Sequence, residues 1–520
     1  MDTWIVPLSL TAKRSPKSAY VGYKCRKIVA LLRANPLGWY NLNKILLIDE
    51  AQQSRVWISV LIERLQQAGY TVGVAHTGSG AVEPSTMDRL LAFEAKRVPS
   101  GLARLCPARD AIRFADPDLV IDLTGRAEWE NAPVLQLLFS GHRRLEQGVA
   151  GLFGTPPAPE LTALIDGTPV GLARPMLDDR VWLTRMTNNL LAAAITLILQ
   201  SIDRVFAGTI VPTSESPQPP IRQGKLTQLY FRNLAHGLSG RLAGKLLRRK
   251  PFYWQVAYRV LEGPGIAETA RLDGPPFTVL GDDGLRFYAD PFLFAHEGRT
   301  FLFVEEFPYG TGKGIISVAE WTGAGFGTPR PVLEESHHLS YPQVFGEGDD
   351  IFMLPEGSGG GELMLYRATA FPDRWEHDTV LLSGREINDA TLYRADGRYW
   401  LFCTERFSPG SASDTLMIFH AEALRGPWIE HKGNPITVDS RAARPGGTFI
   451  GTLPEGLVVP VQDGSRSYGG GLGLMAVTAL DEASVTLGNP RPIAPGPAWD
   501  REGIHTLNRV GAIEVVDSAG

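Results

Sequence analysis

The sequence is poor in cysteine, and its three cysteines, Cys25, Cys106 and Cys403, lie far apart in the chain. This spacing argues against a disulfide framework and against a zinc site, and it fits a reducing compartment. The chain does not open on a basic segment followed by a long apolar run. Its longest apolar run, Leu190–Leu199, is far shorter than a membrane span. We therefore expect a cytoplasmic protein.

An excess of positive charge is also missing, since 51 Lys and Arg residues stand against 56 Asp and Glu residues. The net charge of −5 gives no indication of a nucleic-acid partner. Glycine-rich phosphate motifs are absent too: no G-x-G-x-x-G follows the first predicted strand, and no G-x-x-x-x-G-K-[ST] occurs. The absence of these motifs disfavours a bound nucleotide. Separately, a chain of 520 residues is too long for one domain, so we expect at least two.

Residues 44–205 show the pattern of an α/β domain. Apolar strand-like runs alternate with helical spacing, as in Trp57–Ala68, which predicts a parallel sheet with crossover helices. The predicted strands are Lys44–Asp49, Tyr70–Ala75 and Pro117–Asp122. Ligands of such sheets bind at the carboxyl ends of the strands. The polar residues at those ends are Asp49, His76 and Asp122, although His76 reads as an ordinary loop residue.

Basic segments flank this domain on both sides. The leader, residues 1–43, carries several Lys and Arg residues, and residues 206–251 combine a linker at Thr213–Pro220 with a helix at Leu226–Lys250. The end of that helix, residues 241–250, is strongly basic. This cluster could contact an anionic lipid surface or a phosphate-bearing donor, or it could be a helix C-terminus that cations stabilise.

Residues 252–520 repeat one unit of short strands. Five strand starts align at Asp290, Tyr341, Asp389, Arg444 and His505, at intervals of 51, 48, 55 and 61 residues. A period near 50 residues built from short strands is typical of a β-propeller. The last unit is incomplete, and Phe252–Arg259 could supply its missing outer strand, which would close the ring without free sheet edges. We expect an all-β, five-bladed propeller after the α/β domain.

The first strands of a propeller converge on its axis, so the five reference residues should meet there. Two carboxylates, a phenol, a guanidinium and an imidazole are unusual as core packing, although they could simply cap strand ends. The second strands also end on polar residues, which would form a second ring around the axis. These residues are Glu305, Glu306, Glu356, Glu405, Gln462 and Asp463.

Several stretches of this half carry a resemblance to a known family: Ala289–Phe294, Phe303–Phe307, Leu339–Phe345, Met353–Glu356, Asn388–Tyr393, Ala443–Gly447 and Gly503–Leu507. They resemble the five-bladed propeller at the N-terminus of plant glucosamine inositolphosphorylceramide transferases and of bacterial relatives near surface-polysaccharide genes. In the plant proteins the established transferase is a different, later domain. The resemblance therefore implies the fold and leaves the activity open.

More distantly, the propeller is similar to arabinanase- and xylosidase-type glycosidases. Those inverting enzymes use a general base Asp from the first blade, an orienting Asp from the third and a general acid Glu from the fourth. The resemblance implies that Asp290 is the base and that Asp389 is the orienting residue. The fourth-blade position is Arg444, which cannot release a proton near neutral pH. Either Glu356 or Glu405 is then the acid, or the protein is not a hydrolase of that type.

The same resemblance implies a calcium ion on the axis near His505, bound directly or through water. Arg444 would suit a phosphate or a carboxylate, and Tyr341 would hold a hydroxyl or anionic group of the substrate. Glu305 and Glu306 are further candidates for the acid, and together with Asp463 they are candidates for substrate contacts.

Three stretches of the first half, Lys44–Asp49, Asp118–Leu123 and Leu164–Gly171, carry a second resemblance. They resemble the formyltransferase domain of methionyl-tRNA and sugar-nucleotide formyltransferases. Those enzymes use an Asn, a His and an Asp around a folate cofactor. This half has no Asn-x-His, and no His stands next to Asp166. We expect a scaffold or a substrate-docking role.

Three functions are compatible with these patterns. The first, which we favour, is glycosyl transfer or hydrolysis on a glycan or a nucleotide-sugar in surface-polysaccharide metabolism. The second is a non-catalytic carbohydrate-binding propeller, with a shallow sugar site lined by Tyr288, Phe307, Tyr309, Tyr341 and Phe407. The third is sugar N-formyl transfer.

Overall fold

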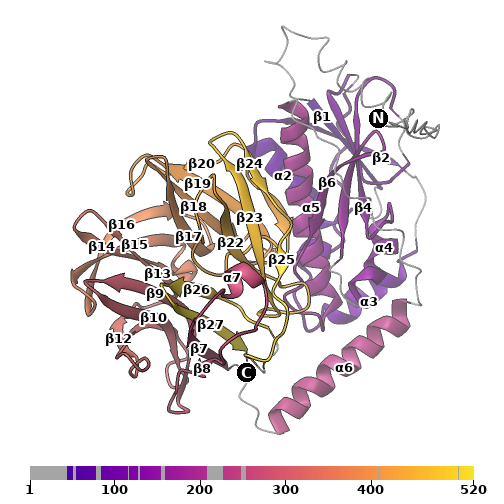
Figure 1. Cartoon of the computed structure of the whole chain (residues 1–520). Coiled ribbons are helices and arrows are strands. Elements are labelled where there is room, and N and C mark those ends of the chain that lie inside the picture. The colour runs from indigo at the N-terminus through magenta and orange to yellow at the C-terminus, as the bar shows by residue number, and fades with distance from the viewer. Residues whose placement is uncertain are drawn as a thin grey trace, which may run out of the picture.

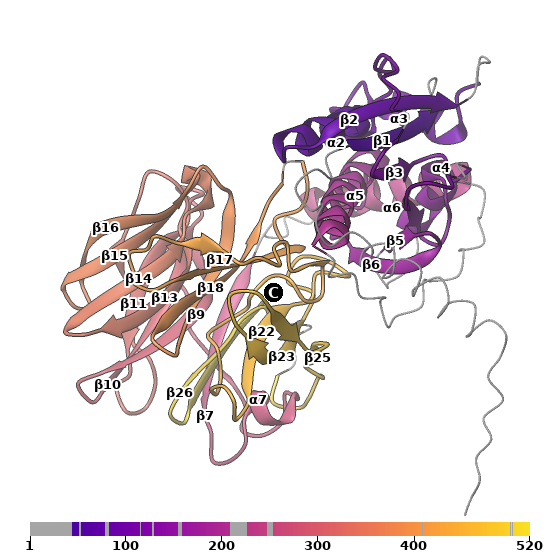
Figure 2. The same ribbon diagram turned by 90° about the horizontal axis from the view of Figure 1, so that it is seen from above.

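The computed structural model describes residues 44–50, 54–77, 83–114, 116–126, 129–153, 159–207, 226–246, 253–407, 409–499, 501 and 503–519. An N-terminal α/β half and a C-terminal all-β, propeller-like half lie side by side (Figures 1 and 2). The leader 1–43, the linker Thr213–Pro220 and the basic residues 247–250 lie outside the described residues.

The N-terminal half is built on a mixed sheet. Its strands are β1 (Lys44–Glu50), β2 (Thr71–Thr77), β3 (Leu119–Asp122), β4 (Val134–Phe139), β5 (Leu161–Ile165) and β6 (Thr168–Arg174). The order β2-β1-β3-β4 is parallel, as the sequence predicts. Strands β5 and β6 then continue the sheet in the antiparallel sense, as the hairpin around Asp166-Gly167. A sheet of parallel strands alone is therefore a wrong expectation, because a two-residue turn cannot make a parallel crossover.

Helices cover this sheet. They are α2 (Val56–Gln67), α3 (Thr86–Glu94), α4 (Leu145–Gly148), α5 (Leu183–Phe206) and α6 (Leu226–Leu246), with 3₁₀ turns η2 (Gly101–Ala103) and η3 (Val149–Phe153). Helix α5 is long and apolar enough to cross a membrane, but 78% of its most apolar window is buried inside the protein. Its apolar residues belong to the main hydrophobic core of the α/β half, so α5 is a core helix of that half.

The C-terminal half consists of antiparallel sheets of about four strands each. The first contains β9 (Arg286–His296), β10 (Arg299–Pro308), β11 (Ile315–Glu320) and β12 (Arg330–Leu333), and the second contains β13 (Ser340–Glu347), β14 (Asp350–Glu356), β15 (Glu362–Ala370) and β16 (Arg374–Ser383). The next contains β17 (Ile387–Ala395), β18 (Arg398–Glu405), β19 (Thr415–Ala421), β20 (Ile429–Glu430) and β21 (Thr437–Asp439).

The last two sheets complete this half. One contains β22 (Leu457–Gln462), β23 (Leu472–Leu480), β24 (Val485–Leu487) and β25 (Arg491–Pro492). The other contains β26 (Leu507–Val510), β27 (Ile513–Ala519), β7 (Trp254–Val260) and β8 (Thr278–Val279), with the short helix α7 (Ile266–Thr269) nearby. Because β7 pairs with β27 along its whole length, strands from both ends of this half share one sheet, as the sequence predicts.

One predicted strand is irregular. The segment at Arg444 makes only isolated bridges, Pro445 with Val461 and Ile450 with Val458. Proline cannot donate to a strand ladder, and Gly447 has a φ of 138°. A Cβ at Gly447 would lie 2.0 Å from the carbonyl oxygen of Leu507, so only glycine permits this approach.

The two halves share one continuous sheet. Strand β21 pairs in parallel with β6, so that β17, β18 and β19 continue into the N-terminal sheet, which has eleven strands in all. An ion pair supports this junction: Arg174 Nη1 lies 3.1 Å from Asp439 Oδ2. The junction therefore fixes the α/β half against the propeller-like half by backbone hydrogen bonds.

Candidate functional site on the propeller axis

The first three sheets share one backbone feature at their reference residues. Asp290, Tyr341 and Asp389 have φ angles of 47°, 48° and 46°, in the left-handed region that L-residues rarely adopt. The strand register shifts at each of these positions. Such bulges re-aim side chains, and strained backbone of this kind clusters at functional sites. The repeated bulge directs the three side chains toward a common centre.

The first part of the axial cluster joins Asp290, His505 and Asp517. His505 Nδ1 lies 3.3 Å from Asp290 Oδ1 and 3.4 Å from Asp517 Oδ2. The backbone amide of Asp290 donates to Asp517 Oδ2 at 2.8 Å, and that of Tyr341 donates to Asp290 Oδ2 at 3.3 Å. The first, second and last units therefore meet here, as the sequence predicts.

The second part joins Asp389 and Arg444. Arg444 Nε donates to Asp389 Oδ2 at 2.6 Å, and Nη2 donates to Asp389 Oδ1 at 3.0 Å. Gln462 donates to Asp389 Oδ2 at 2.5 Å, and the Asp389 backbone amide donates to Glu356 Oε2 at 3.0 Å. Arg444 also reaches Ser413 Oγ at 3.0 Å.

The guanidinium of Arg444 is surrounded by protein groups. All three of its nitrogens donate to them, and Nη2 lies 3.3 Å from Glu356 Oε2 as well as 3.0 Å from Asp389 Oδ1. An anionic substrate would have to displace Asp389. These contacts suit a group that orients Asp389, and the phosphate or carboxylate binding expected of Arg444 stays a prediction.

Tyr341 lies between the two parts of the cluster. Its hydroxyl accepts from the Gly447 amide at 2.6 Å and shares a hydrogen bond with Thr391 Oγ1 at 2.9 Å. The side chain is fully buried. Tyr341 is thus a structural centre of the axis, and the predicted direct contact with a substrate has no support from its exposure.

Two carboxyl groups of the second ring have environments that favour the protonated form. Burial, followed by the negative charges of Asp290 and Glu356, raises the pKa of Glu305 well above its usual range. Burial and the charge of Asp389 likewise raise the pKa of Glu356. Burial also raises the pKa of Asp290, although His505 opposes it.

The pKa of Asp389 is shifted in the opposite direction, below its usual value. Burial alone would raise the pKa of Asp389, but the Arg444 guanidinium and a hydrogen bond from Glu356 lower it below its usual value. An ionised carboxylate and protonated carboxyl groups therefore lie in one cluster. Groups whose pKa values are pushed apart in this way can divide acid and base roles between them.

Three predicted candidates lie outside these contacts. Glu306 points to the opposite face of β10 from Glu305, where it pairs with Arg286 and accepts from Ser317 Oγ at 2.7 Å. Glu405 Oε2 accepts from Arg385 at 2.8 Å. Asp463 caps its own loop, since its Oδ1 accepts from the Ser465 amide at 2.9 Å. Because these carboxylates are occupied locally, the structure gives no support to their expected roles.

The predicted aromatic lining is also only partly realised. Tyr288 is buried, and Phe407 lies 5.5 Å under the guanidinium of Arg64, at the junction of the two halves. Phe307 and Tyr309 are half-buried beside Phe287, and the Phe307 ring lies 6.0 Å from that of His338. His338 Nε2 in turn lies 3.4 Å from Glu305. Phe307 is thus linked through His338 to the axial carboxyl of Glu305.

One wall of the cluster was not predicted. Tyr468 is 39% exposed, and its ring lies 5.4 Å from the guanidinium carbon of Arg444 and 5.2 Å from the His505 ring. Trp254 packs on the other side of His505, at 4.6 Å between rings. Tyr468 sits in an irregular Gly/Ser loop, where neither period nor alternation marks it. Asp517 had a signal, because it follows the apolar residues Val515 and Val516 as Glu305 follows Phe303 and Val304.

The α/β half holds the loop that carries Tyr468. Arg180 Nη2 donates to the Ser465 carbonyl at 2.6 Å, and a Cβ at Gly464 would lie 2.7 Å from the Met176 sulfur. The Met176 amide donates to Asp414 Oδ2 at 3.0 Å, next to the Ser413 that contacts Arg444. Burial raises the pKa of Asp414 to about 7. The segment 174–180 thus supports the axial cluster from outside.

The calcium ion implied by the resemblance fits these residues poorly. Among the described residues, Asp290, His505 and Asp517 have ligand atoms within 4.8 Å of one another. Both Asp517 oxygens already accept hydrogen bonds, from Asp290 and from Thr506 at 2.8 and 2.9 Å. Calcium takes six to eight oxygen ligands. A protonated His505 balances the carboxylates instead, since Tyr468, Asp517 and Asp290 outweigh burial and raise the pKa of His505.

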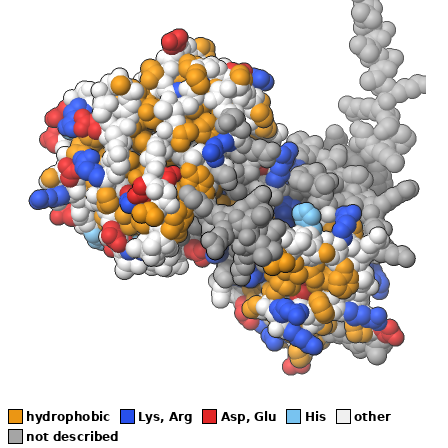
Figure 3. All heavy atoms as spheres, turned by 90° about the horizontal axis from the view of Figure 1, so that it is seen from below, with side chains coloured by type: hydrophobic (Ala, Val, Ile, Leu, Met, Phe, Trp, Pro, Cys, Tyr) orange, Lys and Arg blue, Asp and Glu red, His pale blue; other side chains and the backbone are white. Residues whose placement is uncertain are grey.

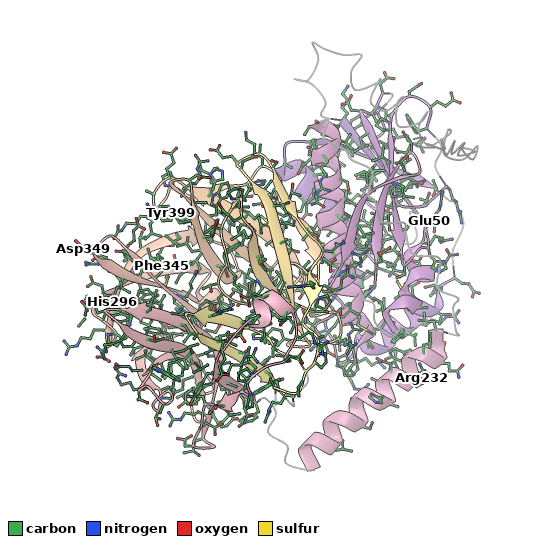
Figure 4. The ribbon with its side chains drawn as sticks, in the orientation of Figure 1. Glu50, Arg232, His296, Phe345, Asp349 and Tyr399 are labelled. Carbon is green, nitrogen blue, oxygen red and sulfur yellow. The ribbon has the colours of Figure 1, made fainter. Side chains whose placement is uncertain are left out.

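The polar strand ends of the α/β half line a separate pocket. It lies where β1 and β3 end, and it is surrounded by Asp49, Asp122, Arg55 and Glu146, with Glu50 marked in Figure 4. These charges are paired within the protein: Arg55 lies 2.8 Å from Asp88 and 3.2 Å from Glu146. His76 contacts Asp49 through Nδ1 and the Arg109 carbonyl through Nε2, so it serves as a loop anchor.

Comparison with known proteins places the axial cluster in a recognised region. Residues 281–509 match the family described as Glucosamine inositolphosphorylceramide transferase 1, N-terminal. The protein of that name from Oryza sativa subsp. japonica is 36% identical over 233 residues, which are 43% of this chain and 31% of the relative. The Arabidopsis thaliana protein is 34% identical over 194 residues, 35% of this chain and 24% of the relative. The chain thus spans about a third or less of these relatives.

Solved structures give a weaker likeness. The α-L-arabinanase of Cellvibrio cellulosa, complexed with arabinohexaose, has a TM-score of 0.30 at 14% identity, over 44% of this chain and 83% of that chain. The β-1,2-mannobiose phosphorylase of Listeria innocua has a TM-score of 0.34 at 13% identity, over 46% and 91%. The similarity to the plant transferases is thus one of sequence, over residues 281–509 of this chain.

Proposed function

We propose that the axial cluster is a carbohydrate site and that the protein transfers or hydrolyses a glycosyl group of a glycan or an activated sugar. The proposal includes a propeller of five blades, one for each C-terminal sheet, with β17–β19 as the third. It is supported by the sequence match over residues 281–509 and by the carboxyl groups that this region gathers.

The observation that carries the proposal is the contrast among the axial carboxyl groups. Burial and neighbouring negative charges raise the pKa of Glu305, and Glu305 lies 3.4 Å from His338, whose ring is next to the half-buried Phe307. Asp389 is held ionised by Arg444. We therefore assign the general acid to Glu305, while Glu356 and Asp389 form the orienting pair.

Asp290 takes the role of the base. In the proposed step Glu305 donates its proton to the glycosidic oxygen, and the bond from that oxygen to the anomeric carbon breaks. A water molecule or an acceptor hydroxyl forms the new bond to the anomeric carbon and passes its proton to Asp290. Hydrolysis and transfer differ only in this acceptor, and a separation of about 6.5–9.5 Å between the two carboxyl groups would suit inversion.

Turnover and binding, measured with the full chain on a panel of oligosaccharides and nucleotide-sugars, test this proposal. Asp290→Asn and Glu305→Gln should each lower turnover by about 10²-fold or more with binding retained. Glu297→Gln is the matched control, because Glu297 lies exposed on the first sheet and its side chain is 80% accessible. Binding without turnover by the wild type would favour a carbohydrate-binding module, and the absence of both would reject the site.

We further propose that residues 44–205 form a formyltransferase-like domain that supports the axial site as a scaffold or docks its substrate. The pocket at the ends of β1 and β3 is where such sheets take ligands. Its charges are already paired, which favours a scaffold or docking role over sugar N-formyl transfer. Product formation that depends on a formyl-folate would reverse this preference.

A further inference from the structure

Helix α6 is fixed to the α/β half by one face. Tyr230 is fully buried and its ring lies 6.5 Å from that of Phe153. Asn233 Nδ2 donates to the Arg180 carbonyl at 2.7 Å, and a Cβ at Gly237 would lie 2.6 Å from a methyl carbon of Val181. A surface helix needs one such face to pack on its domain, so no further apolar face is required for its attachment.

A second face of α6, beside the packed one, is apolar as well. Phe231, Leu238 and Leu242 are 48%, 44% and 59% exposed. They are spaced by seven and four residues, so they form one stripe along the helix, roughly 16 Å long at 1.5 Å per residue. Phe93 at the end of α3 is 45% exposed, and its ring lies 6.3 Å from that of Phe231. We call Phe93, Phe231, Leu238 and Leu242 the α6 apolar face.

The exposed charged residues closest in sequence to this face are cations, since Glu94 beside Phe93 is buried whereas Lys96, Arg97 and Arg232 are exposed. No Asp or Glu occurs between residues 216 and 261, and the charged residues within α6 are Arg232, Arg241 and Lys245. Arg97, which follows α3, is exposed and acts electrostatically on Tyr230. In Figure 3 hydrophobic side chains gather on the α/β half, with Lys and Arg side chains and some Asp and Glu side chains around them, and Figure 4 marks Arg232 on α6.

Single exposed apolar side chains are ordinary on a protein surface. A contiguous apolar stripe beside cations, by contrast, indicates a surface that binds a partner or a membrane. Interfacial helices bury Phe and Leu at the boundary of headgroups and acyl chains, while Lys and Arg contact anionic headgroups. A second copy of the chain fits less well, because the exposed cations Arg97 and Arg232 beside the stripe would face the same cations of the other copy and repel them.

We propose that the α6 apolar face docks the protein on an anionic membrane surface, with Phe231, Leu238 and Leu242 in the interfacial region. This inference is independent of the chemistry proposed for the axial cluster. It describes peripheral attachment, in which the helix keeps its inner contacts to the α/β half.

The test is co-sedimentation of the full chain with vesicles. The wild type should bind vesicles of phosphatidylcholine mixed with phosphatidylglycerol, bind phosphatidylcholine alone far more weakly, and lose binding as salt is added. The double variant Leu238→Glu with Leu242→Glu should partition at least about tenfold less, because two apolar side chains no longer insert. Arg232→Gln should weaken the preference for the anionic vesicles.

Matched controls carry the same change on exposed positions elsewhere. Leu285→Glu and Ile429→Glu, at residues that are 68% and 54% exposed, should leave vesicle binding unchanged. Equal losses in the controls, or a wild type that binds neither vesicle, would overturn the proposal. So would a lipid-independent dimer that the double variant converts to a monomer, since the face would then be a contact between copies.

Discussion

Arg444 grips both carboxylate oxygens of Asp389, with Nε 2.6 Å from Oδ2 and Nη2 3.0 Å from Oδ1, and both side chains are buried. Asp389 lies in β17 and Arg444 in the irregular segment before β22, 55 positions later in the sequence. This pair keeps one axial carboxylate ionised while its neighbours Glu305 and Glu356 favour protonation. The division of charge that the proposed chemistry needs therefore depends on a single guanidinium.

Replacing Arg444 by Met should lower the free energy of unfolding by about 3–5 kcal/mol, because Asp389 would become an uncompensated buried charge. Urea denaturation at neutral pH measures this loss. Arg299→Met is the control: Arg299 pairs with Glu320 at the surface, where such pairs contribute about 1 kcal/mol or less. Similar losses in the two variants would show that the Arg444 pair does not sustain the axis.

His505 should make stability depend on pH in a defined sense. Its pKa is raised in the folded protein, since Tyr468, Asp517 and Asp290 outweigh burial. The stabilisation is therefore complete below the unfolded pKa, about 6.5, and is lost as pH rises through the folded value. The difference in unfolding free energy between the wild type and His505→Gln should shrink toward alkaline pH. A difference that grows with pH would contradict the assignment of an imidazolium.

Calcium removal should have little effect. Because Asp517 already accepts three hydrogen bonds and His505 supplies positive charge, EDTA should leave the melting temperature unchanged near pH 6. Differential scanning fluorimetry with and without EDTA and added calcium measures this. A shift of several degrees, with calcium retained in the purified protein and lost in Asp517→Asn, would restore the calcium site implied by the resemblance.

The contact of Arg180 with the Ser465 carbonyl should order the loop that carries Tyr468. Arg180→Ala removes this hydrogen bond at 2.6 Å, so amide exchange over residues 464–470 should rise while β22 and β23 stay protected. Arg185→Ala is the control, since Arg185 pairs with Asp179 and its side chain is 54% exposed. Unchanged exchange in Arg180→Ala would mean that the loop holds its position without the α/β half.

The sequence predicts that the axial side chains meet, because similar strand starts recur at Asp290, Tyr341 and Asp389. This prediction does not depend on the exact bounds of the strands in each sheet. It cannot decide between Glu305 and Glu306. Neighbouring strand residues face opposite sides, and a register shift between Phe303 and Glu305 sets which of them faces the axis. The partner of Arg444 is likewise hidden, because pairing across sheets depends on packing that no local pattern records.

Other features lie below the resolution of sequence patterns. Strand β21 has only three residues, Thr437–Asp439, yet it joins the two halves in one sheet. A parallel pairing so short has no periodicity of its own. The dipeptide Asp166-Gly167 predicts the hairpin β5–β6, because such dipeptides favour tight turns. The sequence does not predict that this hairpin pairs antiparallel with β4.

The most direct measurement is a crystal structure of the full chain with a sugar selected from the binding panel. The proposed function predicts that the sugar lies on the axis, with the oxygen that is to be protonated within hydrogen-bond distance of Glu305 and its anomeric carbon on the side of Asp290. A sugar bound only in the pocket beside Asp49 and Asp122, or only on the outer surface of the sheets, would contradict it.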